Sequence, residues 1–365
     1  MKLECGALEL KNGISQAERV TGKNLTLPVL NSILLIASGK SLKLRATNLS
    51  LGLEIEIPAK IEKEGVAAIS GSVLLGVFSN IPENEKVGIE GEGGNILVKT
   101  RKSKIRLKGG PTDDFPTIPS VSGKTFEIES KRLVEGFKSV YYSASLSDIK
   151  PEISSVYVYK DDEDLVFVST DTFRLAEKKI KTRGVGELQG IIIPFKNVPE
   201  ILRVFGDYSG SVRVCFNKNQ ISFSSDNTYL TSRVIDGVFP DYRQIIPKES
   251  NTEATLLKQD LLNALKLSNI FSDKFNQLNL TIKPKEKIFE LASENNDVGE
   301  NKTHLDAALE GTPAEISFNH RYFLDCFQSI GTDSINIKIT DAAHPIVVLP
   351  VGDRSFTYLI MPMNR

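Results

Sequence analysis

The sequence predicts an α+β protein made of three similar domains, each with two helices packed on antiparallel sheets. Two observations lead to this prediction. A set of landmarks recurs three times in the same order, and much of the chain alternates apolar and polar residues around short turns, as antiparallel strands do. The length of 365 residues agrees, because it exceeds what one hydrophobic core normally supports. The predicted domains are residues 1–121, 122–249 and 250–365.

The first landmark is a strand-like segment that runs into a small polar triplet. Its copies are LKLRATN, LVFVSTD and IFELASE, which align Thr47, Thr170 and Ser293. Both intervals between these residues are 123 residues long. Each copy is rich in apolar residues and is predicted to be a strand that ends in a polar turn.

The second landmark is an apolar strand followed by a short helix with a phenylalanine near its end. The phenylalanines are Phe78, Phe205 and Phe327, at intervals of 127 and 122 residues. Apolar residues recur three and four positions apart in each short helix, which predicts one buried face. A longer helix opens each unit, and the predicted segments are Ile14–Gly22, Ser130–Ser145 and Lys258–Phe271.

The third landmark is a hairpin of two alternating strands. It aligns Ile96, Ile221 and Ile346, which are 125 residues apart both times. The first two hairpins are followed by FPTIP at Phe115–Pro119 and FPDYRQIIP at Phe239–Pro247, whereas the third runs to the C-terminus. Proline and polar residues in these connectors place the domain boundaries there.

The composition is that of a globular protein, with 40% hydrophobic and 25% charged residues. The formal net charge of −1 does not favour nucleic-acid binding by itself, but segregated charges on different faces remain compatible with it. No apolar run approaches the roughly 20 residues that cross a bilayer. The N-terminal segment shows no signal-peptide pattern, so we expect a cytoplasmic protein with no membrane partner.

No residue pattern points to catalysis, a metal or a cofactor. Cys5, Cys215 and Cys326 lack metal-ligand spacing and predict buried thiols in a reducing compartment. The three histidines form no H-x-x-x-H pair. Gly39-Lys40-Ser41 resembles the end of a phosphate-binding loop, but Leu34 stands where that loop requires glycine. We therefore expect a protein that is not an enzyme.

Four local motifs stand in order along the chain: TLPVLNSILL at Thr26–Leu35, STDTFRLA at Ser169–Ala176, FPDYRQIIP, and the ending YLIMPMNR. They resemble motifs of the bacterial DNA polymerase III beta subunit family, the DNA sliding clamps. Together with the length and the repeat, they extend the resemblance over essentially the whole chain. Three domains of the DNA-clamp type are implied.

The resemblance implies a homodimeric, head-to-tail ring around double-stranded DNA, bound without regard to sequence. Helices of the repeated domains would face the DNA. Their basic residues would contact phosphates, and the candidates are Lys11, Arg19, Lys23, Lys131, Arg132, Lys138, Lys196, Arg203, Lys258, Lys266 and Arg321.

The ring would close between domain 1 of one subunit and domain 3 of the next. KSKIRLKG resembles the family's interface strand, with Ile105 and Leu107 as its apolar residues. Ile270 and Phe271 at the end of a domain 3 helix would be their partners. Charged residues around this contact would set its register.

A hydrophobic peptide pocket between domains 2 and 3 is also implied. Its partners would be the DNA polymerase III catalytic subunit, the clamp loader, and other replication and repair enzymes that carry clamp-binding peptides. Carried over position by position, the pocket residues are Ile153, Thr170, Thr172, Phe173, Arg174, Leu175, Pro240, Gln244, Ile245, Ile360, Met361, Pro362 and Met363.

The sequence departs from the family pattern near this pocket. Thr172-Phe173 replaces a glycine–histidine pair, Gln244 stands where a basic residue is common, and Asn364 replaces an arginine. These changes predict an altered peptide preference. An alternative for Ile360–Met363 is that this segment is the last core strand of the third domain.

Three other functions stay open at this point. A two-domain ring clamp of the eukaryotic or archaeal type shares the architecture, but the three repeats and the Met-Pro-Met ending argue against it. An enzyme on an unfamiliar α+β scaffold lacks a recognisable nucleophile or metal site. An interaction scaffold that does not bind DNA would differ in its retention on circular compared with linear DNA.

Overall fold

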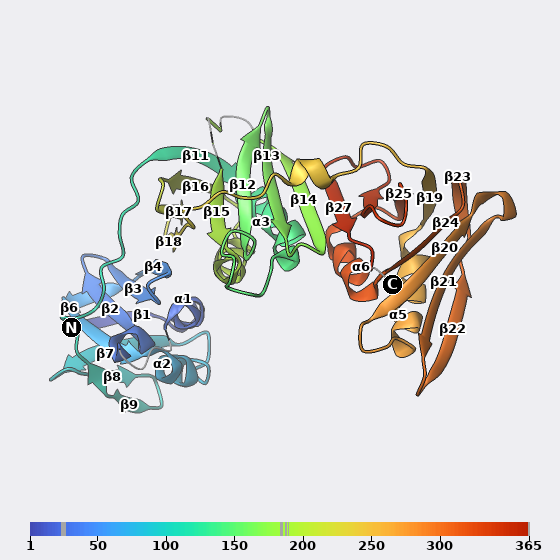
Figure 1. Cartoon of the computed structure of the whole chain (residues 1–365). Coiled ribbons are helices and arrows are strands. Elements are labelled where there is room, and N and C mark those ends of the chain that lie inside the picture. Colours follow the sequence, from blue (N-terminus) through green and yellow to red (C-terminus); the bar gives the residue numbers. More distant parts are fainter. Residues whose placement is uncertain (23–26, 183–184, 187, 189, 364–365) are drawn as a thin grey trace. The chain divides into compact units, whose positions relative to one another are not determined.

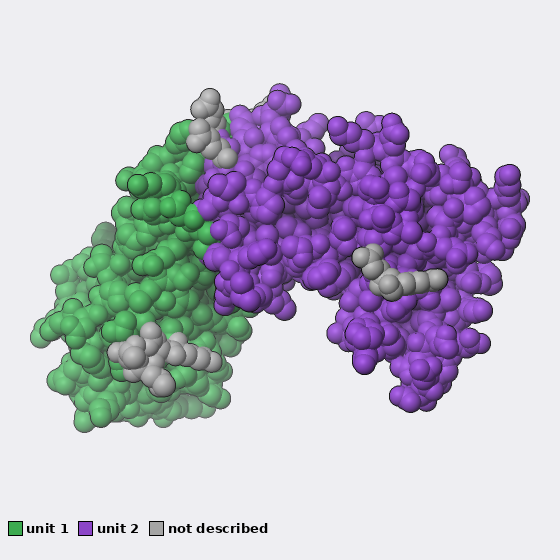
Figure 2. Space-filling view, in the orientation of Figure 1, with its two compact units in different colours: residues 1–134, 184–186, 196–236 green, residues 135–183, 187–195, 237–365 purple. Residues whose placement is uncertain are grey.

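The computed structural model describes residues 1–22, 27–182, 185, 186, 188 and 190–363. The chain divides into two units, coloured separately in Figure 2. Unit 1 contains residues 1–134, 184–186 and 196–236, and unit 2 contains residues 135–183, 187–195 and 237–365. The middle repeat therefore contributes to both units. Every strand pair among the described residues is antiparallel.

Within the described residues, unit 1 holds two sheets, three complete α-helices and the first part of a fourth, α3 (Figure 1). The five-stranded sheet has the order β5 (Lys60–Lys63), β1 (Lys2–Gly6), β7 (Lys86–Glu92), β8 (Asn95–Lys99) and β9 (Lys104–Leu107). The nine-stranded sheet has the order β10 (Gly109–Gly110), β6 (Gly65–Ser70), β2 (Ser32–Ser38), β3 (Ser41–Thr47), β4 (Leu51–Pro58), β18 (Thr228–Arg233), β17 (Gln220–Ser224), β16 (Ser211–Phe216) and β11 (Lys124–Glu129). The helices are α1 (Ala7–Val20), α2 (Gly71–Phe78) and α4 (Val198–Phe205).

Unit 2 has a matching plan. Its nine-stranded sheet runs β15 (Ile191–Pro194), β12 (Ser155–Asp161), β13 (Asp164–Thr170), β14 (Arg174–Lys181), β27 (Phe356–Ile360), β26 (Ile346–Pro350), β25 (Ser334–Ile339), β19 (Thr252–Leu257) and β23 (Ala307–Gly311). Its four-stranded sheet runs β22 (Gly299–His304), β21 (Ile288–Asn295), β20 (Gln277–Lys283) and β24 (Ala314–Asn319). The helices are α5 (Lys258–Ile270) and α6 (His320–Cys326), and α3 (Ser130–Val140) contributes its second half.

The threefold repeat is confirmed in the packing. Thr47 and Thr170 end their strands and Ser293 lies near the end of β21, and all three are buried. The three phenylalanines and the three hairpin isoleucines are buried as well. Each repeat carries two helices and antiparallel strands, as predicted. Sheet hydrogen bonds also cross the repeat boundaries, because β4 of the first repeat pairs with β18 of the second, and β14 of the second pairs with β27 of the third.

Two predicted helix limits were wrong. The first helix begins at Ala7, well before the predicted Ile14, because Gly13 does not interrupt it. A β-carbon at Gly13 would lie 2.8 Å from Leu44 Cδ1 and 3.0 Å from Ile57 Cδ1, so the glycine lets the helix approach the sheet closely. The second helix ends at Val140, and Tyr141–Ser143 form a 3-10 turn in place of the predicted continuation to Ser145.

Candidate functional site

The turn between β13 and β14 is held by its own polar side chains. The Thr170 hydroxyl donates to the Arg174 carbonyl at 2.7 Å and accepts the Thr172 N–H at 3.1 Å. Oδ1 of Asp171 accepts the N–H groups of Phe173 and Arg174, both at 3.0 Å. Thr172 adopts a φ of 77°, a left-handed conformation that is uncommon for a β-branched residue. The turn therefore presents Phe173, whose side chain is 59% exposed, in a fixed position.

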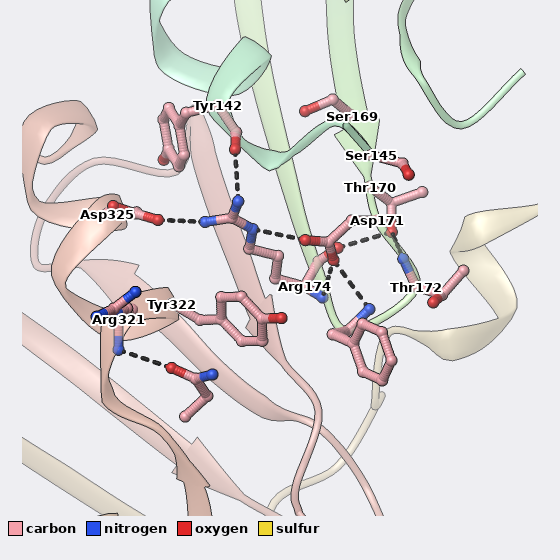
Figure 3. Close-up of polar contacts among 12 residues, drawn as sticks. Tyr142, Ser145, Ser169, Thr170, Asp171, Thr172, Arg174, Arg321, Tyr322 and Asp325 are labelled. Carbon is pink, nitrogen blue, oxygen red and sulfur yellow. Dashed lines mark hydrogen bonds and ion pairs between the residues drawn. The ribbon is translucent and has the colours of Figure 1, made fainter. Parts of the chain in front are cut away.

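Arg174 is the centre of a polar network (Figure 3). Its guanidinium donates to Asp171 Oδ2 at 2.9 Å, to the Tyr142 carbonyl at 2.7 Å and to Asp325. The Tyr322 ring lies over it, with the guanidinium carbon 4.8 Å from the ring centroid. Burial alone would lower the pKa of Arg174, but nearby Tyr358, Asp171 and Asp325 raise that pKa above its ordinary value, so the side chain stays charged.

The C-terminal segment follows directly from a core strand. β27 ends at Ile360, which pairs with Arg174 and is fully buried. The Met361 N–H then donates to the Phe173 carbonyl at 2.8 Å, and the Met363 N–H donates to the Ser317 carbonyl of β24 at 2.8 Å. A depression of about 460 Å³ lies beside Met363, and its lining includes Leu280, Ile316 and Ser317.

The segment that contains FPDYR is anchored to the same sheet. The Tyr242 hydroxyl donates to Glu177 of β14 and lies 2.7 Å from the Tyr159 hydroxyl. Burial and the adjacent Glu177 raise the pKa of Tyr242 well above its ordinary value, so its hydroxyl remains a donor. Arg243 donates to Tyr159 at 2.8 Å and to Asp161 at 2.7 Å. The Phe239 ring stacks on Tyr157, with centroids 4.8 Å apart.

The β13–β14 turn, the C-terminal segment and the FPDYR segment are thus all tied to β14. We call the accessible residues of these segments the junction surface. Its exposed members are Thr172, Phe173, Pro240, Gln244 and Ile245. The half-buried members are Met361, Pro362 and Met363. Ile153 is half-buried on a neighbouring loop whose ends are joined by the bond from the Ser145 N–H to the Ile153 carbonyl.

Four of the predicted pocket residues have other roles in the structure. Thr170, Leu175 and Ile360 are buried in the sheet, so they support the surface instead of lining it. For Ile360 the core-strand alternative is correct, because the strand ends there, whereas Met361–Met363 lie beyond it. Arg174 was expected to line the pocket, but its guanidinium is already engaged by Asp171, Asp325 and the Tyr142 carbonyl. Asn364 lies outside the described residues.

The sequence did not reveal the residues of the third repeat that belong to the polar network around Arg174. Tyr322 and Asp325 lie on α6, about 150 residues from the turn they contact, and no local pattern marks them. The acidic residue of the triplet, Asp171, was noted only as a repeat landmark. The available sequence signal was the aspartate itself, because aspartate side chains in turns commonly accept backbone N–H groups two or three residues later, as Asp171 does here.

Most of the predicted DNA-facing cations are accessible. Arg19, Lys131, Arg132, Lys138, Lys196, Arg203, Lys266 and Arg321 are exposed on or beside helices. Two are half-buried: Lys258 donates to the Ile330 carbonyl at 2.6 Å, and Lys11 pairs with Glu83 at 2.7 Å. Among the exposed residues, Arg132 pairs with Glu129 at 3.1 Å and Arg203 with Glu200 at 3.2 Å. Lys23 lies outside the described residues.

The two predicted interface regions are both at sheet edges. β9 is an edge strand on which Ile105 is half-buried and Leu107 is buried, so Leu107 packs mainly within its own sheet. β22 is the edge of the four-stranded sheet in unit 2. Near it, Ile270 is 60% exposed and Phe271 is half-buried, and two further apolar side chains, Phe275 and Val298, are each 57% exposed.

Comparison with known families matches all three repeats. The N-terminal, central and C-terminal domain models of the DNA polymerase III beta subunit match residues 1–119, 127–241 and 243–364. The chain belongs to the DNA polymerase III beta subunit family. This is the family of the sliding clamp, the non-catalytic processivity factor of DNA replication.

Relatives of this family cover the whole chain. The beta sliding clamp of Synechococcus elongatus is 28% identical over 372 residues, covering 100% of this chain and 99% of its own. The beta sliding clamp of Staphylococcus aureus is 25% identical and covers 93% of each chain. Among solved structures, the Thermotoga maritima beta subunit has a TM-score of 0.94 at 24% identity, covering 100% of this chain and 99% of its own. A Bartonella birtlesii clamp bound to griselimycin has a TM-score of 0.94 at 26% identity, covering 100% of both chains.

Other candidate sites from the sequence resolve as structural features. His320 is buried between the Asn276 carbonyl at 3.0 Å and Asn269 Oδ1 at 2.6 Å. The described residues contain no group of three or more His, Cys, Asp or Glu side chains placed to hold a metal ion. The same described part of the chain has no helix long and apolar enough to cross a membrane. Cys5, Cys215 and Cys326 are free thiols.

Proposed function

We propose that this beta subunit forms a closed homodimeric ring that slides on double-stranded DNA and tethers partner enzymes through the junction surface. The partners are the DNA polymerase III catalytic subunit, the clamp loader, and other replication and repair enzymes that carry clamp-binding peptides. The ring would act in the cytoplasm. We keep the three predicted domains with boundaries after residues 121 and 249.

The observation that carries the proposal is the junction surface itself. Apolar side chains of Phe173, Ile245, Met361 and Met363 remain accessible, although the polar groups beneath them are satisfied within the chain. An exposed apolar cluster on a rigid polar base is typical of a protein-interaction site. Methionine adapts to differently shaped anchors, as a surface with several partners requires. Clamps of this fold from Pseudomonas aeruginosa and Bartonella birtlesii have been solved with griselimycin bound, which supports a ligand site on the fold.

The DNA proposal is supported by the exposed cations on the helices. Lys131, Arg132 and Lys138 share one accessible face of α3, and Arg132 pairs with Glu129 at 3.1 Å. Contacts of this kind read phosphates and not bases, so affinity should fall steeply with salt and be independent of sequence. A K131Q/R132Q/K138Q triple variant should weaken retention on nicked circular DNA, while K283Q, on a strand of the third repeat, serves as a matched control.

The dimer proposal is supported by apolar and acidic groups near the end of α5. A depression of about 590 Å³ there is lined by Phe275 and by the carboxylates of Asp273, Glu294 and Asp297. A basic edge strand such as β9, which carries Lys104 and Arg106, complements these charges. Arg106 already pairs with Glu92 at 2.8 Å, so Lys102 and Lys104 are the better candidates for crossing the interface. I270A/F271D should yield monomers in sedimentation, and a variant that stays dimeric at micromolar concentration contradicts this interface.

The partner-binding proposal is tested with a short polymerase-derived peptide that carries leucine and phenylalanine anchors. Removal of residues 361–365 should abolish peptide binding while the protein remains dimeric. Because the truncation also deletes the backbone bonds of Met361 and Met363, the double variant M361A/M363A is measured beside it; it should weaken binding at least about tenfold, since two apolar contacts are lost. Unchanged affinity in both variants would show that the peptide binds elsewhere.

A further inference from the structure

Phe173 is fixed by its backbone and not by burial. Its N–H donates to Asp171 Oδ1 at 3.0 Å, and its carbonyl accepts the Met361 N–H at 2.8 Å. The side chain nevertheless stays 59% exposed. A large apolar ring that remains mostly in solvent forgoes much of the favourable burial available to it. It is therefore best explained by what it contacts in a complex.

The preceding residue strengthens this hold. Thr172 has a φ of 77°, where a glycine would be relaxed and a β-branched residue is strained. The family pattern has glycine at this position and histidine at the next. A threonine restricts the backbone that carries the ring more than a glycine does, so the substitution Thr172-Phe173 replaces a mobile polar side chain with a restricted apolar one.

A second ring extends the surface. Phe173 and Tyr322 lie nearly parallel, with an interplanar angle of 19° and centroids 6.5 Å apart. Tyr322 is held in turn against the guanidinium of Arg174, which Asp171 and Asp325 fix in place. Phe173 and Tyr322 thus form a preorganised aromatic ledge, and Met361 follows it through the backbone bond to Phe173.

We propose that Phe173 determines the peptide specificity of the junction surface, selecting partner peptides that place an aromatic side chain on the Phe173–Tyr322 ledge. This inference rests on the proposed function, because it assumes that peptides bind here. Aromatic rings pair favourably in offset or edge-to-face arrangements, whereas a phenylalanine offers no hydrogen bond to a polar side chain such as glutamine. A histidine at the same position would accept or donate a hydrogen bond and would titrate near neutral pH.

The test uses a peptide set with fixed leucine and phenylalanine anchors. At each remaining position in turn, one peptide carries phenylalanine and a matched peptide carries glutamine. Affinities are measured by fluorescence anisotropy on the full-length dimer. The native protein should prefer phenylalanine to glutamine by about tenfold at one position, the upper range of a single aromatic pair. F173H should reduce that ratio to about twofold or less. F173L, which keeps an apolar side chain without the ring, should give an intermediate ratio.

A pH series separates specificity from a general structural effect. The ionisable groups beside the Phe173 ring are Asp171, Arg174, Tyr322 and Asp325. Between pH 5.5 and 7.5 the native protein should keep a constant phenylalanine-to-glutamine ratio, whereas F173H should acquire a dependence centred near the histidine pKa of about 6.5. L49H is the matched control, because Leu49 is an exposed apolar residue in the equivalent turn of the first repeat, 42% exposed. It should change neither the ratio nor its pH profile.

The outcomes separate a failure of the specificity proposal from a failure of the proposed function. If peptides bind the native protein but F173H retains the native ratio and pH profile, the specificity proposal is wrong and the binding surface stands. If no peptide binds the folded native dimer, or if peptide affinity is unchanged both in M361A/M363A and after removal of residues 361–365, the proposed peptide site fails and the specificity proposal fails with it.

Discussion

Two turns of the same construction, one in the first repeat and one in the second, end in different surroundings. In the first, the Thr47 hydroxyl donates to the Leu51 carbonyl at 2.7 Å, and Asn48 accepts the N–H groups of Ser50 and Leu51. Leu49 has a φ of 73°, close to the 77° of Thr172. The Arg233 N–H donates to the Ser50 carbonyl at 2.9 Å, as the Met361 N–H does to Phe173. The backbone therefore follows the same design in both places.

The two turns differ in the side chains that contact the following repeat. Asn197, at the start of α4, donates to Ser50 at 3.0 Å and to Ser232 at 2.8 Å, and it is only 3% exposed. In the second turn, Phe173 and Arg174 meet Tyr322 and Asp325 of α6 and leave an aromatic ledge in solvent. Small, mutually satisfied polar groups close the first junction. Large apolar groups around one charged arginine leave the second junction partly exposed. The first turn therefore serves cohesion, and under the proposed function the second would serve recognition.

The largest expected effect comes from removing the charge of the second junction. R174M leaves Asp171 and Asp325 without their cation, and the Asp171 side chain is only 15% exposed. Stability should fall by about 3 kcal/mol in urea unfolding, and peptide binding should be lost because Tyr322 is no longer held. R203M removes a cation that is 40% exposed and should change stability by less than about 0.5 kcal/mol. Equal effects of the two variants would contradict the assigned role of Arg174.

A smaller loss is expected at the first junction. N197A leaves the hydroxyls of Ser50 and Ser232 without their shared donor in a buried position. The free energy of unfolding should fall by about 2 kcal/mol, the cost of unsatisfied buried groups. Peptide affinity should stay unchanged. A loss of peptide binding in N197A would contradict the assignment of separate roles to the two junctions, stability for the first and peptide binding for the second.

His320, the buried first residue of α6, predicts a pH effect. Burial lowers the pKa of His320 below its ordinary value of 6.5, with Arg321 acting in the same direction and the Asn276 carbonyl and Asp273 opposing it. The unfolded chain therefore binds the proton more readily, so stability should fall as the pH decreases below about 6.5. The slope attributable to this group is at most about 1.4 kcal/mol per pH unit. H320Q should flatten the unfolding profile between pH 7.5 and 5.5, whereas H304Q, at an exposed histidine, should not.

The smallest effect concerns the strained third residue of each turn. T172G and L49G both relieve a left-handed conformation but increase the entropy of the unfolded chain. Each should change stability by no more than about 1 kcal/mol in either direction. Only T172G should weaken peptide binding, because only that turn carries an exposed ring. A matching loss in L49G would indicate a global effect of glycine.

Local patterns in the sequence predicted much of the architecture. The spacing of Thr47, Thr170 and Ser293 predicted three repeats because buried strand ends recur with the fold. The family resemblance placed the turn, the FPDYR segment and the Met-Pro-Met ending together in one pocket, and the structure ties all three to β14. Tyr322 and Asp325 were missed, because their contact with Arg174 depends on tertiary packing over about 150 residues.

Burial was the other property that the sequence could not provide. Leu175 and Met363 look equally suited to a hydrophobic pocket, yet one is 1% exposed and the other is accessible. The difference depends on strand pairing: Leu175 pairs with Leu359 within the sheet, whereas the chain beyond Ile360 has left it. Gly13 is a similar case, because only the contact with Leu44 and Ile57 explains a glycine in the middle of a helix.

The pairing of β14 with β27 links a strand of the second repeat to the last strand of the third. As a result, the segment Pro247–Ser250 is not the only connection between these parts of the chain. A protease cut there would produce two fragments that stay associated, since five aligned residue pairs and the packed side chains around Arg174 would still join them. The same bond pattern makes this segment a natural place to divide the chain into two separately expressed pieces that reassemble on mixing.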